Sequence, residues 1–179
     1  LDTLLAETKA EIDHLESIQN SLDIALSADD LVQIKQELME YGFIKKHRTG
    51  KKEKVKSKPF HYISSDGYHI YVGKNNFQNE ELSFKFANGG DWWFHAKEIP
   101  GSHVIVKSNC DELPDRTFEE AARLAAYYSK GRDAEKVEID YIQKKQVKKT
   151  PGGKPGFVIY HTNYSLLIDP DIRNIQQVK

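Results

Sequence analysis

The chain has 179 residues, of which 39% are hydrophobic, 30% charged and 11% aromatic. At about 100–200 residues per domain, this length predicts one domain with at most an appendage, and the composition excludes a largely disordered chain. No apolar run approaches the ~18–20 residues that cross a bilayer, so a transmembrane protein is not expected. The single cysteine, Cys110, excludes an internal disulfide and a zinc site built from several thiolates.

The chain opens with Leu1 rather than Met, and the stretch that follows is acidic rather than basic with an apolar centre. We therefore expect no secretory signal peptide and interpret the sequence as a piece of a longer protein. A lone thiol without a signal segment favours a reducing, cytoplasmic location, with the cell surface as the alternative.

Charge is strongly segregated, although the net charge is only −1. Residues 1–44 contain ten acidic and two basic residues, whereas residues 45–58 contain eight basic residues and one acid, Glu53. Like charges packed closely repel one another, which predicts an extended linker over 45–58, or alternatively a tether that binds phosphates. The predicted organisation is a helical arm over 1–44, this basic linker, and a globular domain over 59–179.

The acidic arm has the periodicity of two helices. Apolar residues recur every three or four positions over residues 1–26, without an internal Pro or Gly. Ser27 and Asp30 resemble a capping box that begins a second helix, and Gly42 can end it in a left-handed conformation. Two helices joined by a short turn form an antiparallel hairpin. We interpret it as the end of a coiled coil, with a self-contained bundle as the alternative.

From Pro59 onward the pattern changes to short strands and turns. The Asp66-Gly67 turn is expected to join strands over 60–64 and 68–73. Asn79 is expected to cap a helix over 80–87 with Phe86 on its inner side, and Thr117 with Glu120 to cap a helix over 118–130. Further strands are predicted over 91–96, 103–107, 137–142 and 147–150, and a final hairpin over 157–161 and 164–168. Successive hairpins with two inserted helices predict an α+β fold with a largely antiparallel sheet.

Segment 91–103 carries the densest set of chemically informative side chains. Alternate residues of a strand share a face, so Asp91, Trp93 and His95 are expected on one side and Trp92 on the other. One indole would fill the core, and the other would face outward as a platform on which nucleic-acid bases stack. The alternative is that both tryptophans belong to the core.

Two polar segments favour binding of nucleic acid. Residues 143–155 contain no acid, and lysines that neutralise phosphates give salt-dependent binding. The turn at 73–76 adds a further cation and two amides, which can read base edges or merely complete a turn. The candidate RNA-binding side chains from these segments and the aromatic strand are Lys74, Asn75, Asn76, Trp92, Trp93, Lys144, Lys145, Lys148, Lys149 and Lys154.

Catalysis and metal binding have weaker support. Asp91, His95, His103 and Cys110 could hold a metal ion or move protons, but their spacing matches no zinc signature. There is also no nucleophile elbow, Walker loop or paired-carboxylate motif. We therefore expect no enzymatic activity, no bound metal and no cofactor, and keep a metal-dependent nuclease as the weakest alternative.

A series of short motifs, taken in order, resembles a known family. The motifs are Ser65-Asp66-Gly67, Val72-Gly73-Lys74-Asn75-Asn76, Gln78-Asn79, Asp91-Trp92-Trp93-Phe94-His95, Ile99-Pro100-Gly101-Ser102-His103-Val104, Glu120-Ala121-Ala122, Ala125-Ala126-Tyr127-Tyr128-Ser129 and Lys154-Pro155-Gly156. Over about residues 59–170 they resemble the NFACT-R domain. This domain is the C-terminal region of the bacterial ribosome-associated quality control, or fibronectin-binding protein A-like, family. The arm and linker are similar to the end of that family's middle coiled coil and the linker after it.

The resemblance implies that the chain contacts transfer RNA and the large ribosomal subunit. Family members bind that subunit when it carries an obstructed nascent chain, recruit alanyl transfer RNA and support untemplated tailing. Tailing is not expected from this chain alone, because the family's N-terminal domain is absent from it. The matched residues to which the resemblance assigns an RNA-contact role are Lys74, Asn75, Asn76, Asp91, Trp93, His95 and His103.

We therefore predict a non-enzymatic RNA-binding module of a ribosome-associated quality control factor. The alternative is a surface adhesin fragment that binds fibronectin or fibrinogen, since several Gram-positive relatives carry that description. The acidic arm is expected to face a protein partner or a second copy of the chain, and no membrane contact is expected.

Overall fold

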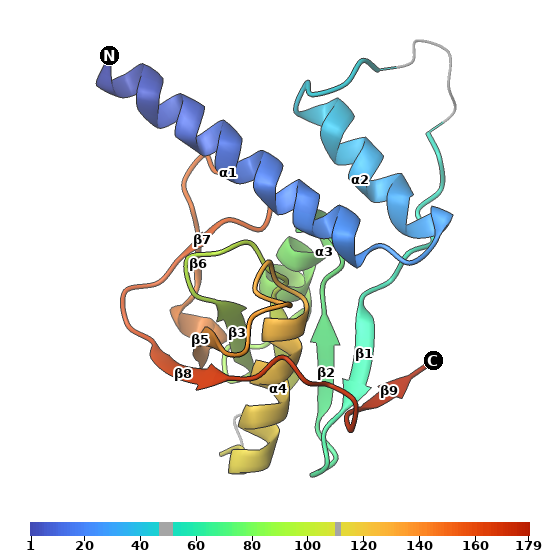
Figure 1. Ribbon diagram of the computed structural model, residues 1–179, viewed down its shortest axis with the longest axis vertical. Helices are drawn as coiled ribbons and strands as arrows, with labels where there is room; N and C mark the ends of the chain where they lie inside the picture. The colour runs from blue at the N-terminus through green and yellow to red at the C-terminus, as the bar shows by residue number, and fades with distance from the viewer. Residues whose placement is uncertain (47–51, 110–111) are drawn as a thin grey trace.

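The structure is a computed structural model that describes residues 1–46, 52–109 and 112–179. An N-terminal pair of helices lies beside an α+β domain, and the amino end of the first helix projects away from that domain (Figure 1). The central linker prediction falls partly on residues 47–51, which lie outside the described residues.

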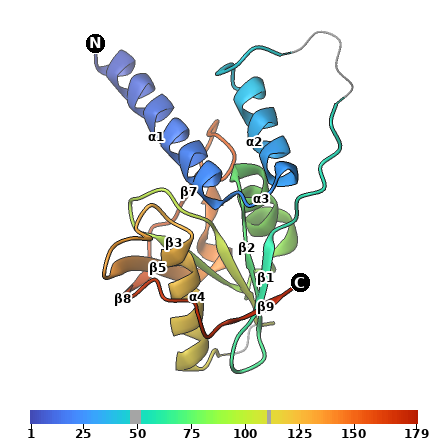
Figure 2. The ribbon, with the colours of Figure 1, turned by 45° about the vertical axis from the view of Figure 1, so that its right-hand side comes forward.

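The predicted helical hairpin is confirmed. It consists of α1 (Asp2–Ile24) and α2 (Ala28–Glu40), which diverge from the turn between them (Figure 2). Gly42 has a φ of 78°, the left-handed conformation expected after the second helix. The capping box is only partly right, because Ser27 occupies the N-cap position without a side-chain bond and Asp30 Oδ2 accepts instead from the Leu26 amide at 3.0 Å.

The amino-terminal half of α1 packs against no other element among the residues that the structure describes. The buried side chains of this helix lie between His14 and Ile24, where the helix meets the domain. Its amino-terminal half keeps large apolar side chains in solvent, an arrangement typical of a helix that continues into a longer assembly. The exposed ones along α1 are Leu1, Leu4, Leu5, Ile12, Leu15 and Leu22.

The domain contains a seven-stranded sheet in the order β8-β5-β3-β4-β2-β1-β9. Every neighbouring pair is antiparallel, which confirms the predicted α+β class. A separate two-stranded ribbon joins β6 to β7. The bounds are β1 Phe60–Ile63, β2 His69–Val72, β3 Trp92–Ala96, β4 Val104–Lys107, β5 Val137–Gln143, β6 Lys148–Lys149, β7 Val158–Ile159, β8 Tyr164–Ile168 and β9 Gln176–Val178.

The pairing of the last strands differs from the prediction. Segments 157–161 and 164–168 do not form a hairpin with each other, because β7 pairs with β6 and β8 pairs with β5. Strand β9 was not predicted at all, since its three residues include only one apolar side chain, Val178, and it adds to β1 from the far end of the chain.

Both domain helices begin earlier than predicted. The first, α3 (Asn76–Glu81), is capped by Asn75 rather than Asn79, and it continues as a π-helical turn, η1 (Leu82–Phe86). The Asn79 side chain instead accepts the backbone N–H of His103 at 3.1 Å.

The longer helix, α4 (Asp115–Tyr127), begins after Pro114, so the predicted capping box is wrong. Thr117 donates to Asp66 at 2.8 Å, and Glu120 accepts from the backbone and hydroxyl of Ser65 at 2.9 and 3.0 Å. Both side chains therefore hold the β1–β2 turn.

Apolar clusters cover both faces of the sheet. On one face, α4 packs its buried alanines against Phe94 and Val104, because methyl side chains let a helix approach a sheet closely. On the other face, Trp93 and Ile105 pack beneath η1 and the β6–β7 ribbon. The predicted alternation is confirmed, because Trp92 and Trp93 lie on opposite faces of the sheet. The face that carries Trp93 is covered by a second apolar core and is not exposed to solvent.

Candidate nucleic-acid interface

The two indoles have different environments. Trp93 is 0% exposed, and its Nε1 donates to Ser83 Oγ at 3.2 Å. A base cannot stack on this ring while the second core is in place. Trp92 is only partly buried and meets Phe118 edge-on, with 4.9 Å between ring centroids. Only Trp92 can therefore serve the stacking role that we predicted for one tryptophan.

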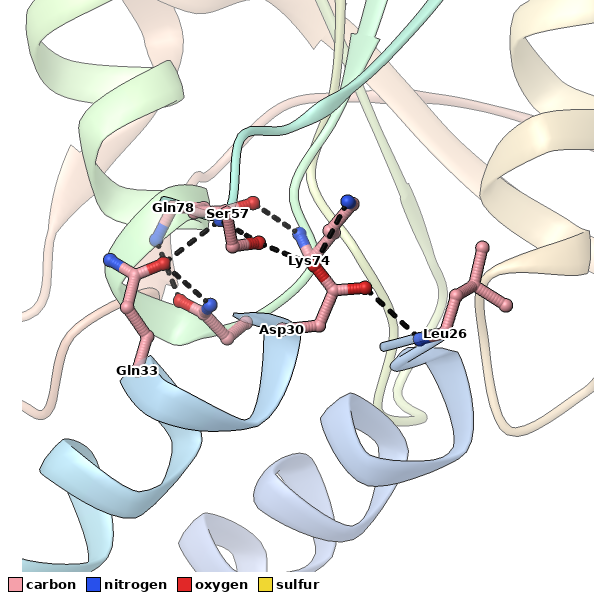
Figure 3. A network of polar contacts seen from close by, with 7 residues as sticks. Leu26, Asp30, Gln33, Ser57, Lys74 and Gln78 are labelled. Carbon is pink, nitrogen blue, oxygen red and sulfur yellow. Dashed lines mark hydrogen bonds and ion pairs between the residues drawn. The ribbon is translucent and has the colours of Figure 1, made fainter. Parts of the chain in front are cut away.

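The segment that begins at Lys74 fastens the helical hairpin to the domain (Figure 3). Asn75 Oδ1 accepts the backbone N–H of Gln78 at 3.0 Å, and Asn75 Nδ2 donates to Gln33 of α2 at 3.0 Å. Asn76 Nδ2 donates to Ser17 of α1 and to Glu37 of α2, both at 2.9 Å. Both asparagines are buried, so their amides are already used for contacts within the chain.

Lys74 also contacts the hairpin. Its Nζ lies 3.1 Å from Asp30 Oδ1, and Ser57 donates to the same oxygen at 2.7 Å. Burial disfavours ionisation of Asp30, but the bonds from Ser57 and the Leu26 amide, together with the Lys74 ammonium, outweigh it and hold the pKa of this carboxyl below its usual value. The charge of Lys74 is thus compensated inside the molecule.

Asp91 closes the turn before β3. Its carboxylate is 0% exposed and accepts from Lys107 Nζ at 2.7 Å and from the amides of Asn88 and Ser108 at 2.8 and 3.1 Å. Burial opposes its ionisation, but these three donors outweigh that effect, so the pKa of Asp91 lies below its usual value. Asp91 therefore holds the turn before β3 to the end of β4.

The two histidines of the aromatic segment lie together. Their ring centroids are 5.6 Å apart, and both border a cavity of about 690 Å³ between α1 and the domain. His103 Nε2 donates to the Gly156 carbonyl at 2.8 Å, and its Nδ1 accepts from Ser83 at 2.7 Å. Burial lowers the pKa of His103 to about 3, helped by the neighbouring ring, and burial also lowers the pKa of His95. Both rings are neutral at physiological pH, so neither offers a charge to phosphate.

A pH dependence of stability follows from these neutral rings. An ordinary histidine takes up a proton near pH 6.5, so the unfolded chain binds more protons than the folded chain below that pH. The free energy of unfolding is therefore expected to fall by up to about 1.4 kcal/mol per pH unit through His103 as the pH drops below 6.5, and His95 acts in the same direction. The acids Asp30 and Asp91 contribute only near and below their ordinary value of 3.8.

Urea unfolding between pH 6.5 and 5 measures this dependence. We expect His103→Asn to be less stable at neutral pH but to show a shallower fall of stability with pH. An unchanged slope in that variant would mean that His103 takes up its proton in the folded state as well.

Two lysines of the basic loop lie beside a ring that sequence analysis did not select. The Nζ atoms of Lys144 and Lys149 lie 5.6 and 5.3 Å from the centroid of Phe84 in η1. Lys145 and Lys148, their neighbours in sequence, are exposed. Within residues 1–46, 52–109 and 112–179, none of these four lysines forms an ion pair. Their positive charge therefore faces solvent.

The neighbouring ring of η1 extends this surface. Phe86 was predicted to face inward, but it is 39% exposed, and Lys107 Nζ lies 4.7 Å from its centroid. The π-helical turn redirects the side chain, which helical periodicity could not anticipate. The only sequence signal was the aromatic–basic–aromatic triplet 84–86 before two glycines. We define the Phe84 surface as Phe84, Lys85, Phe86, Lys144, Lys145, Lys148 and Lys149, and leave out Lys107 because its charge is paired with Asp91.

Lys154 is separated from the other lysines of its loop. Its Nζ lies 4.7 Å from the ring centroid of Tyr41, at the carboxyl end of α2. The candidate lysines and asparagines thus divide into two groups. One forms the Phe84 surface, and the other, with Lys74, Asn75, Asn76 and Lys154, contacts the helical hairpin.

The structure adds three findings on the metal, acid–base and membrane expectations. In the described parts of the chain, no three His, Cys, Asp or Glu side chains are arranged to hold a metal ion. The hydrogen bonds of Asp91 there go to neither His95 nor His103, so this proposed acid–base trio is not assembled. Cys110 lies outside the described residues. Among those described, no helix combines the length and apolar character needed to cross a bilayer.

Comparison with known proteins places this arrangement in a family. The profile described as NFACT protein RNA binding domain matches residues 58–161, and that of the NFACT N-terminal and middle domains matches residues 1–57. The Rqc2 homolog RqcH of Streptococcus pneumoniae is 45% identical over 180 residues, which span all of this chain and 32% of that protein. The ribosome quality control complex subunit 2 of Schizosaccharomyces pombe is 38% identical over 82 residues, 44% of this chain and 8% of that protein.

A solved structure has the same fold. It is the C-terminal part of the fibronectin/fibrinogen-binding protein from Streptococcus suis, with a TM-score of 0.89 and 42% identity over 98% of this chain and 71% of that one. The chain spans about a third of the length of its bacterial relative. By its sequence matches and its fold, the chain belongs to the NFACT family and contains the family's RNA-binding domain.

Proposed function

We propose that the chain is a non-enzymatic RNA-binding module of a ribosome-associated quality control factor, and that the Phe84 surface carries the binding. The observation behind this proposal is a group of four lysines that lack ion-pair partners in the described residues. The Nζ atoms of two of them, Lys144 and Lys149, lie 5.6 and 5.3 Å from the centroid of one partly buried phenyl ring, and the other two are exposed. Ammonium groups neutralise phosphates, and an aromatic ring beside them offers a face or an edge to a base.

Transfer RNA and the large ribosomal subunit are the proposed ligands. The fission-yeast relative is named as a subunit of the ribosome quality control complex, and the bacterial relative is named as an Rqc2 homolog, which supports ligands of this kind. The α1–α2 hairpin carries an excess of acidic residues and repels phosphate. In the proposed complex, RNA therefore approaches from the side of η1 and β6.

Titration of the chain with transfer RNA at several salt concentrations tests this proposal. Four phosphate contacts predict a slope of log affinity against log salt of about −3, which is roughly a fiftyfold loss of affinity between about 50 and 200 mM salt. Absence of binding at low salt would refute RNA binding, and affinity indifferent to salt would refute the role of the lysines.

Fibronectin or fibrinogen binding is the second candidate. The observation in its favour is the name of the Streptococcus suis protein, to which the chain is 42% identical. The Phe84 surface could attract acidic segments of such a partner. Binding of the chain to immobilised fibronectin tests this candidate, and no binding at micromolar concentration would remove it.

A further inference from the structure

A column of stacked aromatic rings leads from the core to the edge of the sheet. Phe94, which is 0% exposed, stacks on Tyr141 with 5.5 Å between centroids and 17° between ring planes. Tyr141 stacks on Tyr164 at 5.5 Å and 28°. Tyr164 lies on the edge strand β8 and is 60% exposed. The outer ring is therefore positioned by the ring behind it, while most of its surface remains in water.

A cavity of about 300 Å³ lies beside this outer ring. Its apolar walls include Trp92, whose ring centroid is 6.5 Å from that of Tyr164. Its polar groups are side-chain amides, two hydroxyls and an indole N–H, and no charged residue lines it. The full lining is Trp92, Ile142, Gln143, Gln146, Thr162, Asn163 and Tyr164.

Several polar groups of this lining have no partner in the part of the chain that the structure describes. Trp92 Nε1 is buried and makes no hydrogen bond there, although buried donors in proteins are nearly always paired. The amides of Gln143 and Gln146 also form no bond among the described hydrogen bonds, whereas Asn163 Nδ2 donates to Asp140 at 2.9 Å. The cavity thus combines aromatic walls with donors and acceptors that remain available.

We infer that this cavity receives a single unpaired base of an RNA strand, an inference that rests on the proposed RNA-binding function. The base extends the column by stacking on Tyr164 and presents its edge to the amides of Gln143 and Gln146. Recognition of single-stranded RNA commonly combines these two interactions. A neutral lining suits a neutral planar ring and not a phosphate, which needs cations around it.

The position of the cavity connects it with the Phe84 surface. Trp92 packs with the α4 side of the sheet, whereas Phe84 packs with the opposite side. The end of β5 links the two sides, because Gln143 pairs with Trp92 and the Nζ of the next residue, Lys144, lies 5.6 Å from the Phe84 centroid. Lys144 and Lys145 lie between the two glutamines in sequence. A strand whose phosphates lie on these lysines can place one base in the cavity and continue towards Phe84.

Binding of a short single-stranded oligoribonucleotide, compared with the same oligomer lacking bases at successive positions, tests this inference. The two ligands carry the same phosphates, so the lysines do not distinguish them. Loss of the base at one position should weaken binding about tenfold, within the range measured for base–aromatic stacking. Tyr164→Ala should bind both oligomers equally, and Tyr164→Phe should retain the difference.

Leu167→Ala is the matched control, because Leu167 lies on the same strand and is 61% exposed. It should behave as the unaltered chain does. If the unaltered chain binds the two oligomers equally, the base site is refuted while RNA binding stands. A base preference that persists in Tyr164→Ala also refutes it. If neither oligomer binds at low salt, the proposed function fails as well.

Discussion

Replacing the four lysines Lys144, Lys145, Lys148 and Lys149 together with alanine should lower RNA affinity by roughly two orders of magnitude at low salt. The reason is that these ammonium groups have no ion-pair partner in the described chain and are free to neutralise phosphates. The slope of log affinity against log salt should become shallower by about 3. Fluorescence anisotropy with labelled transfer RNA measures both quantities.

Lys74→Ala is the informative control for this experiment. Lys74 was also predicted to contact RNA, but its side chain is only 15% exposed and is paired with Asp30. Its removal should leave RNA affinity within about twofold and should lower the stability of the chain instead, because Asp30 loses a buried partner. Equal losses of affinity in the Lys74 variant and the fourfold variant would contradict the division of the lysines into two groups.

His14→Ala should destabilise the chain by about 3 kcal/mol, because it empties a fully buried site and removes a hydrogen bond from the buried Glu37. His14 Nε2 lies 2.7 Å from Glu37 Oε2, with both side chains 1% exposed, and this contact joins α1 to α2. Without the imidazole, a buried carboxylate would keep only the bond from Asn76. Urea unfolding at neutral pH measures the loss.

Glu40→Ala, which removes an exposed acid from the same hairpin, provides the comparison. It should change stability by no more than about 0.5 kcal/mol. The double variant His14→Leu/Glu37→Leu should recover much of the stability lost in His14→Ala, because it replaces both hydrogen-bonding partners with apolar side chains. A loss below about 1 kcal/mol in His14→Ala would show that this pair does not hold the hairpin.

Local patterns were sufficient for much of the fold. The three- and four-residue spacing over 1–26 predicted α1, and the Asp66-Gly67 turn predicted the β1–β2 hairpin. Alternation along 91–96 placed Trp92 and Trp93 on opposite faces of the sheet. In each case the signal depends on residues that are neighbours in sequence.

Predictions failed where a side chain had a distant partner. Thr117 and Glu120 have capping-box spacing, yet they bind a turn more than 50 positions earlier. Strand β9 forms because the fold brings it beside β1, whereas its own three residues show no alternation of apolar and polar side chains long enough to predict a strand. Such outcomes depend on the assembled fold, which overrides the local preference of the residues.

The candidate site shows the same limit. The charge run of 143–155 indicated where cations would be found, but not that Phe84 would lie among them, since the π-helical turn sets that ring's direction. Lys74 looks like a free cation in the sequence, and its partner Asp30 is 44 positions away. Charge density predicted the kind of ligand, whereas the fold determines which of the charges remain free to bind it.

Chemical modification of surface lysines in the presence and absence of transfer RNA tests the central claim most directly. Mass spectrometry then reports how strongly each lysine reacts. We predict that RNA protects Lys144, Lys145, Lys148 and Lys149, and leaves Lys9 on α1 and Lys136 before β5 as reactive as in the free chain. Protection of Lys9 with full reactivity at 144–149 would contradict RNA binding on the Phe84 surface.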